Sequence, residues 1–256
     1  MLSTGRIATL VSLHCLLYVF QTAGSSGAVQ LPNGFVTCKR ADPEVNTCIQ
    51  RALQRSIPHL VKGIPLLDLL PIEPLFITHM DINQSSGPLI IKLNFKDLNI
   101  HRLSSVKIIS LKSDIDKFTF NIKADFDEPL VIDALYKVQG KIIILPIRGE
   151  GRSNLTLTGV KATIEARGKP IMKNNEKYME LDYLNLKFST SHLHVKLDNL
   201  FNGDKFLGNN MNQYLNRNWR DILKEVQPDV EATLGSAFQS IGHQFFSKLP
   251  YNQIFR

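Results

Sequence analysis

Two histidines, His192 and His194, have the residue type and spacing that could bind a metal ion. Side chains two residues apart on a β-strand point to the same face, so both imidazoles would lie side by side. A zinc site needs three or four ligands, and no Cys, Asp or Glu stands near this pair at a suitable spacing. A solvated strand face that alternates with Leu193 and Val195 is the better interpretation. No metal site is predicted.

Asp114 and Asp116 are close enough in sequence to act as a pair of carboxylates, an arrangement that general acid–base catalysis uses. A polar turn ahead of a strand at Phe118 explains them better. The sequence also lacks a Gly-x-Ser-x-Gly elbow, a Gly-x4-Gly-Lys phosphate loop and a His-Glu-x-x-His motif. We therefore predict that the chain is not an enzyme and needs no cofactor, and a hydrolase is only the third hypothesis.

The N-terminus has the features of a secretory signal peptide. Arg6 supplies a positive charge, an apolar run follows from Ile7 to Phe20, and small residues come next. We assign residues 1–24 to the signal peptide, with cleavage between residues 24 and 28, and residues 25–256 to one domain. The apolar run is shorter than the roughly 18 residues that a membrane span needs, and no later segment reaches that length. The protein is expected to be extracellular, without a membrane span.

Removal of the signal peptide takes Cys15 with it and leaves only Cys38 and Cys48. In an oxidising compartment these two are expected to form a disulfide, although two free thiols are the alternative. The short loop between them predicts a gain of about 2–3 kcal/mol in stability. Asn83 and Asn154 each begin an Asn-x-Ser/Thr sequon, so both are predicted glycosylation sites.

Charge argues against nucleic acid as a partner. The formal net charge is +7, but the basic residues are spread along the chain and form no block. No Gly/Ser-rich or Pro-rich linker divides the middle of the sequence, which favours one continuous fold. We expect a monomer.

The elements that must position these residues are mainly strands. Alternation of apolar and polar residues between positions 75 and 197 predicts about seven long, mostly antiparallel strands. The pattern is cleanest from Phe118 to Phe126. Its phase reverses near Asp97, across Gly159 and ahead of Leu184, which predicts bulges and sharp bends. Such strands would curl into a strongly curved sheet.

Two segments show helical spacing. One begins at Asp42-Pro43-Glu44 and is expected to be limited by Pro58 and Gly63. The other runs from an N-cap at Asp204 to Lys248, with apolar residues mostly four apart, so its buried face winds around the helix. Pro228 predicts two pieces, 205–226 and 228–248, and a single kinked helix is the close alternative. A curved sheet that surrounds the helix would explain the winding face.

The ends of the chain resemble the takeout proteins of insects, which belong with the juvenile hormone-binding proteins. Four sequence segments show the resemblance: CKRADPEVNTCIQRAL (38–53), LVKGIPLLDLLPIEPL (60–75), DNLFNGDKFLGNNMNQYLNRNW (198–219) and FFSKLPYNQIF (245–255). The resemblance spans the whole mature chain. It implies an α+β fold with a strongly curved antiparallel β-sheet wrapped around a long C-terminal α-helix. It also implies an elongated single domain, an internal hydrophobic tunnel and a disulfide at Cys38 and Cys48.

Apolar residues on the inward faces of the expected strands and helix are candidates for the tunnel lining, although core packing is the default explanation for any one of them. These ligand-binding candidates are Phe95, Phe118, Phe120, Ile122, Tyr136, Val138, Leu155, Leu186, Phe188, Leu215, Trp219, Leu234 and Phe238.

The first functional hypothesis is a secreted carrier that binds a small hydrophobic ligand in the tunnel. The resemblance implies juvenile hormone or another isoprenoid or fatty-acyl lipid. The alternative is a secreted interaction or signalling module with a filled core and no cargo. The takeout resemblance links either one to circadian or feeding physiology.

Overall fold

The computed structural model describes residues 29–256, so the predicted signal peptide, its cleavage site and Cys15 lie outside the described residues. The described chain contains nine strands and four α-helices. The strands are β1 Leu75–Gln84, β2 Leu89–His101, β3 Val106–Asp114, β4 Thr119–Phe126, β5 Leu130–Ile142, β6 Leu145–Thr158, β7 Lys161–Lys173, β8 Glu176–Ser189 and β9 His192–Leu197. The helices are α1 Val45–Lys62, α2 Lys205–Arg217, α3 Trp219–Lys248 and α4 Tyr251–Ile254.

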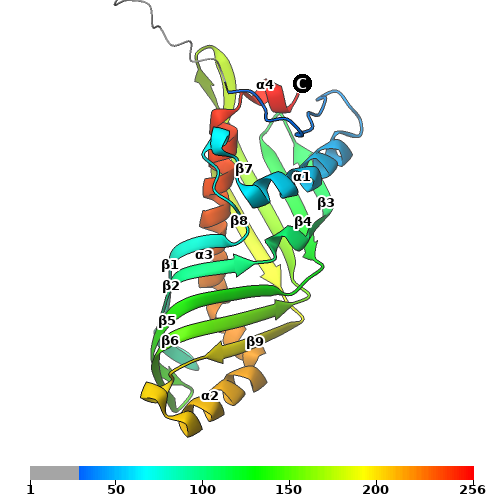
Figure 1. Ribbon diagram of the computed structural model, residues 1–256. Helices are drawn as coiled ribbons and strands as arrows, with labels where there is room; N and C mark the ends of the chain where they lie inside the picture. The colour runs from blue at the N-terminus through cyan, green and yellow to red at the C-terminus, as the bar shows by residue number, and fades with distance from the viewer. Residues whose placement is uncertain (1–28) are drawn as a thin grey trace, which may run out of the picture.

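The strands form two antiparallel sheets, with orders β1-β2-β5-β6-β9 and β3-β4-β7-β8. Figure 1 shows the five-stranded sheet in the lower half of an elongated molecule, the four-stranded sheet in the upper half, and α3 running along both. The predicted α+β fold, a curled antiparallel sheet around a long C-terminal helix, is confirmed. The expectation of about seven strands in one sheet is wrong, because hydrogen bonding divides nine strands into two sheets.

The phase reversals have two different structural causes. At Asp97 the register of β2 against β5 shifts between Lys96 and Asn99, and Asp97 has a φ of 53°, so the predicted bulge is confirmed. Gly159 instead ends one sheet and begins the other, because it forms the turn between β6 and β7 with a φ of 62°. A Cβ at this position would lie 2.6 Å from Ser191 Oγ, which also favours glycine.

The C-terminal helix breaks at Asn218 and not at Pro228. Asp204 caps α2 as predicted, since its Oδ1 accepts a hydrogen bond from Leu207 N at 2.9 Å. The predicted boundary between 226 and 228 is wrong, because α3 continues through Pro228. The single-helix alternative is right at Pro228 but not for the whole run, which is divided into α2 and α3. The helical turn that precedes Pro228 contacts β1, because Gln84 Nε2 in that strand donates a hydrogen bond to Glu225 O at 3.1 Å.

Helix α1 also tolerates its proline. It runs through Pro58 to Lys62, so the expected limit at Pro58 is wrong. Gly63 ends it with a φ of 76°, as predicted. A Cβ on Gly63 would lie 2.8 Å from Leu69 O, so the chain can leave the helix here only without a side chain.

Amide side chains on helices satisfy the backbone of edge strands. In α2, Asn212 binds both N and O of Leu197 in β9, each at 2.9 Å, and Asn216 binds both N and O of Val195 at 2.8 and 2.7 Å. These contacts close an edge that would otherwise expose unpaired donors and acceptors. They also fix α2 against the lower sheet.

The same device places α1 on the upper sheet. Gln54 accepts from Ile108 N at 2.8 Å and donates to Val106 O at 3.0 Å, while Gln50 donates to Ile108 O at 2.8 Å. All of these backbone groups belong to β3, an edge strand of the four-stranded sheet. Helix α1 is therefore held at the sheet edge while its apolar face stays free to line the interior.

Candidate functional site

An apolar cavity of about 410 Å³ lies inside the upper half of the molecule. Its walls come from α1, the four-stranded sheet, α3, the segment from residue 31 to 38, and the C-terminal residues. It extends to the adjoining ends of β2, β5 and β6, which contribute Ile100, Leu130 and Leu157. Among the described residues 29–256, Ser56 is the only one with a polar side chain on this wall, and its hydroxyl donates to Leu53 O at 2.7 Å. The cavity therefore presents almost pure hydrocarbon to an occupant.

The sheet side of the wall follows from strand alternation. In β4, Phe120, Ile122 and Ala124 face the cavity, whereas Asn121 and Lys123 between them are exposed. Because successive side chains of a strand point to opposite faces, one run of alternating residues creates both a wall and a solvated surface. The paired strand β7 and its neighbour β8 continue this wall with Ala162, Ile164, Ala166, Leu184, Leu186 and Phe188.

Helix α3 forms the opposite side with Val230, Leu234, Phe238, Ile241 and Phe245, spaced three or four residues apart. This spacing keeps them on one face of the helix. Only the second half of the winding apolar face therefore reaches the cavity, and the first half packs elsewhere.

A buried carboxylate anchors α3 to β8 beside the cavity. Glu231 Oε2 accepts from Lys187 Nζ at 2.6 Å, and Oε1 accepts from Phe188 N at 3.1 Å and Gln227 Nε2 at 2.7 Å. Burial raises the pKa of Glu231, but these hydrogen bonds outweigh burial and hold the pKa below its ordinary value. Because Val230 and Phe188 both line the cavity, the anchor fixes the spacing of two walls.

Helix α1 closes a further side with Ile49, Ala52, Leu53 and Ile57. None of these residues was among the predicted lining. Their helical spacing is visible in the sequence, but spacing shows only that a face is buried and not what it covers. The contacts of Gln50 and Gln54 with β3 supply the missing information.

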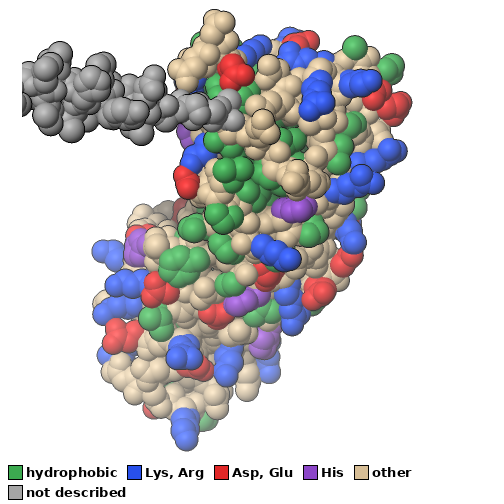
Figure 2. All heavy atoms as spheres, turned by 45° about the horizontal axis from the view of Figure 1, so that its top comes forward, with side chains coloured by type: hydrophobic (Ala, Val, Ile, Leu, Met, Phe, Trp, Pro, Cys, Tyr) green, Lys and Arg blue, Asp and Glu red, His purple; other side chains and the backbone are tan. Residues whose placement is uncertain are grey.

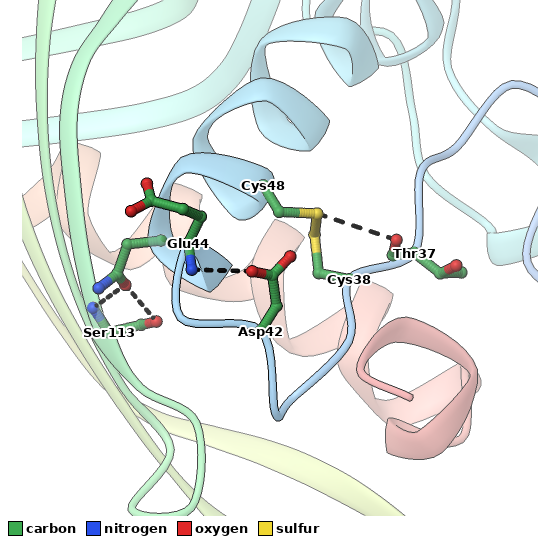
Figure 3. The surroundings of a disulfide bond; sticks show 7 residues. Thr37, Cys38, Asp42, Glu44, Cys48 and Ser113 are labelled. Carbon is green, nitrogen blue, oxygen red and sulfur yellow. Dashed lines mark hydrogen bonds between the residues drawn. A yellow bond between two sulfur atoms is a disulfide. The ribbon is translucent and has the colours of Figure 1, made fainter.

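The top of the cavity is covered by the segment from residue 31 to 38 and by the C-terminal residues. Cys38 N donates to Ile254 O at 3.1 Å, and Arg256 N donates to Cys38 O at 2.9 Å. The predicted Cys38–Cys48 disulfide is confirmed, with an S–S distance of 2.04 Å, and it joins this segment to the first turns of α1 (Figure 3). Phe35 packs against Phe245 with ring centroids 6.0 Å apart. The disulfide therefore connects α1 to the cover of the cavity.

Tyr251 is a rigid part of this cover. Its side chain is fully buried and its hydroxyl donates to Ile115 O at 2.9 Å. Burial raises the pKa of Tyr251 well above its ordinary value, so it stays neutral. Phe118 packs on its ring at a centroid distance of 4.8 Å. Phe118 has a φ of 56° and precedes β4 in a turn, which directs it to Tyr251 and away from the cavity wall.

Six of the thirteen predicted lining residues lie on the cavity wall. They are Phe120, Ile122, Leu186, Phe188, Leu234 and Phe238. The other seven lie away from it: Phe95, Phe118, Tyr136, Val138, Leu155, Leu215 and Trp219. Except for Phe118, they pack in the five-stranded half of the molecule, because alternation identifies the inward face of a strand but not the end where the interior is hollow.

Trp219 was predicted to line the cavity together with Phe120. Trp219 instead belongs to a buried cluster with Ile100, Leu193 and Leu223, and its ring lies 5.6 Å from that of His192 in an edge-on arrangement. The break at Asn218 places Trp219 at the start of α3, at the far end of that helix from Phe245.

The polar candidates have structural positions. His192 and His194 are exposed and alternate with buried Leu193. Asp114 Oδ1 accepts from Lys117 N at 3.0 Å, which confirms the predicted polar turn, and hydrogen bonds from Lys117 lower the pKa of Asp114.

The two predicted glycosylation sites are accessible. Asn83 in β1 and Asn154 in β6 are both exposed. Within residues 29–256, no helix has the length and apolar character needed to cross a bilayer.

Comparison with known proteins gives a consistent result. The profile of the family described as haemolymph juvenile hormone binding protein matches residues 15–256. The chain is 28% identical to the circadian clock-controlled protein daywake of Drosophila yakuba, over 94% of this chain and 96% of that protein. It is 30% identical to the juvenile hormone-binding protein of Manduca sexta, but over only 36% of this chain and 39% of that protein.

The crystal structure of Takeout 1 from Epiphyas postvittana superposes with a TM-score of 0.76 at 22% identity, covering 86% of this chain and 99% of that chain. This likeness shows that the two chains share a fold. The family profile covers nearly the whole sequence, including α1, both sheets and α3. The chain therefore belongs to the haemolymph juvenile hormone-binding protein family.

Proposed function

We propose that the protein is a secreted, non-enzymatic carrier that binds a small hydrophobic ligand in the apolar cavity. The observation that carries the proposal is the cavity itself. Its volume of about 410 Å³ is in the range of small-molecule sites, and the residues that the structure describes place a single polar side chain, Ser56, on its wall. The family's description and the Manduca sexta relative name juvenile hormone, so a lipid of that kind is the first candidate.

An empty cavity of this size would be costly. At about 24 cal/mol per Å³ of apolar void, 410 Å³ corresponds to about 10 kcal/mol. That is similar to the whole net stability of a typical domain, which is about 5–15 kcal/mol. A ligand that restores the missing contacts removes much of this cost, so the free energy of folding favours an occupied state.

The wall favours a neutral ligand. The described part of the chain contributes no Lys, Arg or His to it, and the hydroxyl hydrogen of Ser56 is already bonded to Leu53 O. A carboxylate inside would lose its hydration without gaining a partner, which is strongly unfavourable. An isoprenoid or fatty-acyl ester therefore suits the cavity better than the corresponding free acid.

The alternative is a secreted interaction module that carries no cargo. The daywake relatives are named as circadian clock-controlled, which fits a signalling role as readily as transport. A filled core is the physical requirement of this alternative, and the cavity weighs against it.

A pair of ligands tests the carrier directly. A fluorescent apolar probe would be bound to the purified protein and displaced by farnesoic acid methyl ester or by farnesoic acid. The carrier proposal predicts displacement by the ester, and the neutral-ligand argument predicts a weaker effect of the acid at neutral pH. A protein that binds no probe, and whose native mass shows no co-purified lipid, would support the module instead.

Secretion and glycosylation are part of the same proposal. Expression with the native N-terminus should release a shortened protein into the medium, and a glycosidase should reduce its mass if Asn83 or Asn154 carries a glycan. Gel filtration should give the mass of a monomer. Full-length protein retained in the cytosol would contradict the extracellular role.

A further inference from the structure

The turn between β5 and β6 exposes three consecutive apolar side chains. Ile143, Ile144 and Leu145 are 60%, 84% and 41% exposed. Ile142 pairs with Leu145, so Ile143 and Ile144 form a two-residue hairpin loop. Single exposed apolar residues are common on protein surfaces, whereas three in succession at a hairpin end indicate a contact site.

The backbone conformation of the turn does not favour these residues. Ile143 has a φ of 57°, a left-handed conformation that is rare for a β-branched side chain. Two-residue hairpin loops with a positive φ at the first position favour glycine or asparagine there. The chain therefore carries isoleucine where local stability favours another residue, although Ile143 is 60% exposed. Strain of this kind is typical of functional sites.

Basic residues surround this turn on the outer face of the five-stranded sheet. Lys141 pairs across the strands with Ile90, and Lys92 and Arg148 both pair with Gln139 in the next outward-facing row. All three basic side chains are exposed, and none forms an ion pair with another residue in the described range 29–256. Lys141 and Arg148 lie one and three residues behind the Ile142–Leu145 pair, which is about 3 and 10 Å along the strands.

We propose that the β5–β6 turn docks the protein on an anionic phospholipid surface. Residues 143–145 would enter the boundary between headgroups and acyl chains, which lies about 5–10 Å deep for an interfacial segment. Lys92, Lys141 and Arg148 would then lie at the depth of the phosphate and serine headgroups. These three basic residues form a basic collar behind the apolar turn. An apolar end with a basic collar matches the order of acyl chains and charged headgroups in such a surface.

This docking site is separate from the ligand cavity. Leu130, the first residue of β5, lines the cavity, and the turn follows the last residue of this 13-residue strand. The two ends of β5 are about 40 Å apart along the strand. The turn lies in the five-stranded half, and α4 lies at the other end of the molecule (Figure 1). Docking by the turn would leave the cavity cover facing away from the lipid.

The test uses a variant that should fold better while it binds less. In Ile143→Gly/Ile144→Ser, the turn gains the residues that its backbone favours and loses its apolar surface. On sedimentation with phosphatidylcholine vesicles that contain phosphatidylserine, binding should fall about tenfold or more. The melting temperature should hold or rise, and binding of the apolar probe in the cavity should not change. Ile109→Ser, at a 54% exposed isoleucine of β3, is the matched control and should bind like the parent.

A second pair of variants tests the collar at equal net charge. Replacing Lys92, Lys141 and Arg148 together by Gln should weaken binding about 100-fold, at about 1 kcal/mol per basic residue near an anionic surface. Replacing Lys39, Lys112 and Lys123, which are exposed in the other half, should have much less effect. Equal losses in the two triple variants would show nonspecific attraction and overturn the proposal. A parent protein that does not sediment with these vesicles, or a turn variant that binds as the parent does, would overturn it too.

Discussion

The two halves of this molecule each consist of an antiparallel sheet and helices, but the interior of one is packed with side chains and the interior of the other contains a cavity. In the lower half, side chains of β1, β2, β5 and β6 pack directly on α2 and the first half of α3, in a cluster that includes Phe95, Tyr136 and Leu215. In the upper half, the second half of α3 faces the four-stranded sheet and α1 across a cavity of about 410 Å³. Figure 2, which turns the top of the molecule forward, shows apolar side chains gathered on the surface of this upper part.

This difference shows how one helix can serve two purposes. The apolar face of α3 is continuous from Trp219 to Phe245, and nothing in its spacing marks where packing gives way to the cavity. The change occurs where the second layer becomes α1, because α1 is held at the edge of β3 by Gln50 and Gln54 and does not collapse onto α3. The position of α1, rather than the character of α3, keeps the cavity open.

Removal of a large side chain should give the largest difference in stability between variants of the two halves. Phe95 is buried in the packed cluster, so Phe95→Ala should lower the free energy of unfolding by about 3–5 kcal/mol. Phe238 is only partly buried and borders the cavity, so Phe238→Ala should cost clearly less. Chemical denaturation of both variants measures the difference. Equal costs would mean that the cavity half is packed as tightly as the other half.

Addition of a large side chain should reduce probe binding in the cavity half and stability in the packed half. Ala124 lines the cavity, so Ala124→Trp should reduce probe affinity by about 100-fold or more with little change in melting temperature. Ala134 is buried in the packed cluster, so Ala134→Trp should cost about 1–3 kcal/mol and leave probe binding intact in the folded fraction. Intact probe binding by a stable Ala124→Trp variant would place the ligand elsewhere.

The disulfide should matter only for the cavity half. Cys48→Ser should cost about 2–3 kcal/mol, because the loop that Cys38 and Cys48 close is short. Hydrogen exchange should increase in α1 and in the segment around Cys38, and the amides of β5 should change little in conditions far from unfolding. Non-reducing peptide mapping of the parent should find the two cysteines linked. Faster exchange throughout both sheets would contradict a local role.

The asparagine contacts of α2 give a smaller effect in the packed half. Asn216→Ala removes the bonds from its side chain to N and O of Val195, and it should cost about 1–2 kcal/mol. Probe affinity should not change, since α2 does not line the cavity. Asn216→Asp, which keeps an acceptor but loses the donor, should recover only part of the stability.

Acid should reduce stability through Glu231, the carboxylate that anchors α3 to β8. The pKa of Glu231 is lowered in the folded protein, so its contribution to stability is present above the pKa of the unfolded chain and is lost as pH falls through the folded pKa. Glu231→Gln should therefore be less stable than the parent at neutral pH, and the two should converge in strong acid. Thermal unfolding across this pH range measures the effect, and parallel curves would contradict it.

Several structural features were predictable because local chemistry determines them. Asp204 caps a helix because its oxygen reaches Leu207 N, the bulge at Asp97 follows from a change in alternation, and two remaining cysteines in an expected secreted chain can pair only with each other. The alternation in β4 correctly separated Phe120 and Ile122 from Lys123. Each of these inferences depends on residues that are close together in sequence.

The tertiary structure decided the rest. Pro228 and Pro58 sit inside helices because packing against neighbouring strands outweighs their unfavourable local effect, so local rules placed both boundaries wrongly. Gly159 separates two sheets, which a phase change alone cannot distinguish from a bend. The sequence by itself determined which faces are apolar. The cavity depends on the spacing between those faces, and that spacing is set by long-range contacts such as Gln54 with β3 and Glu231 with β8.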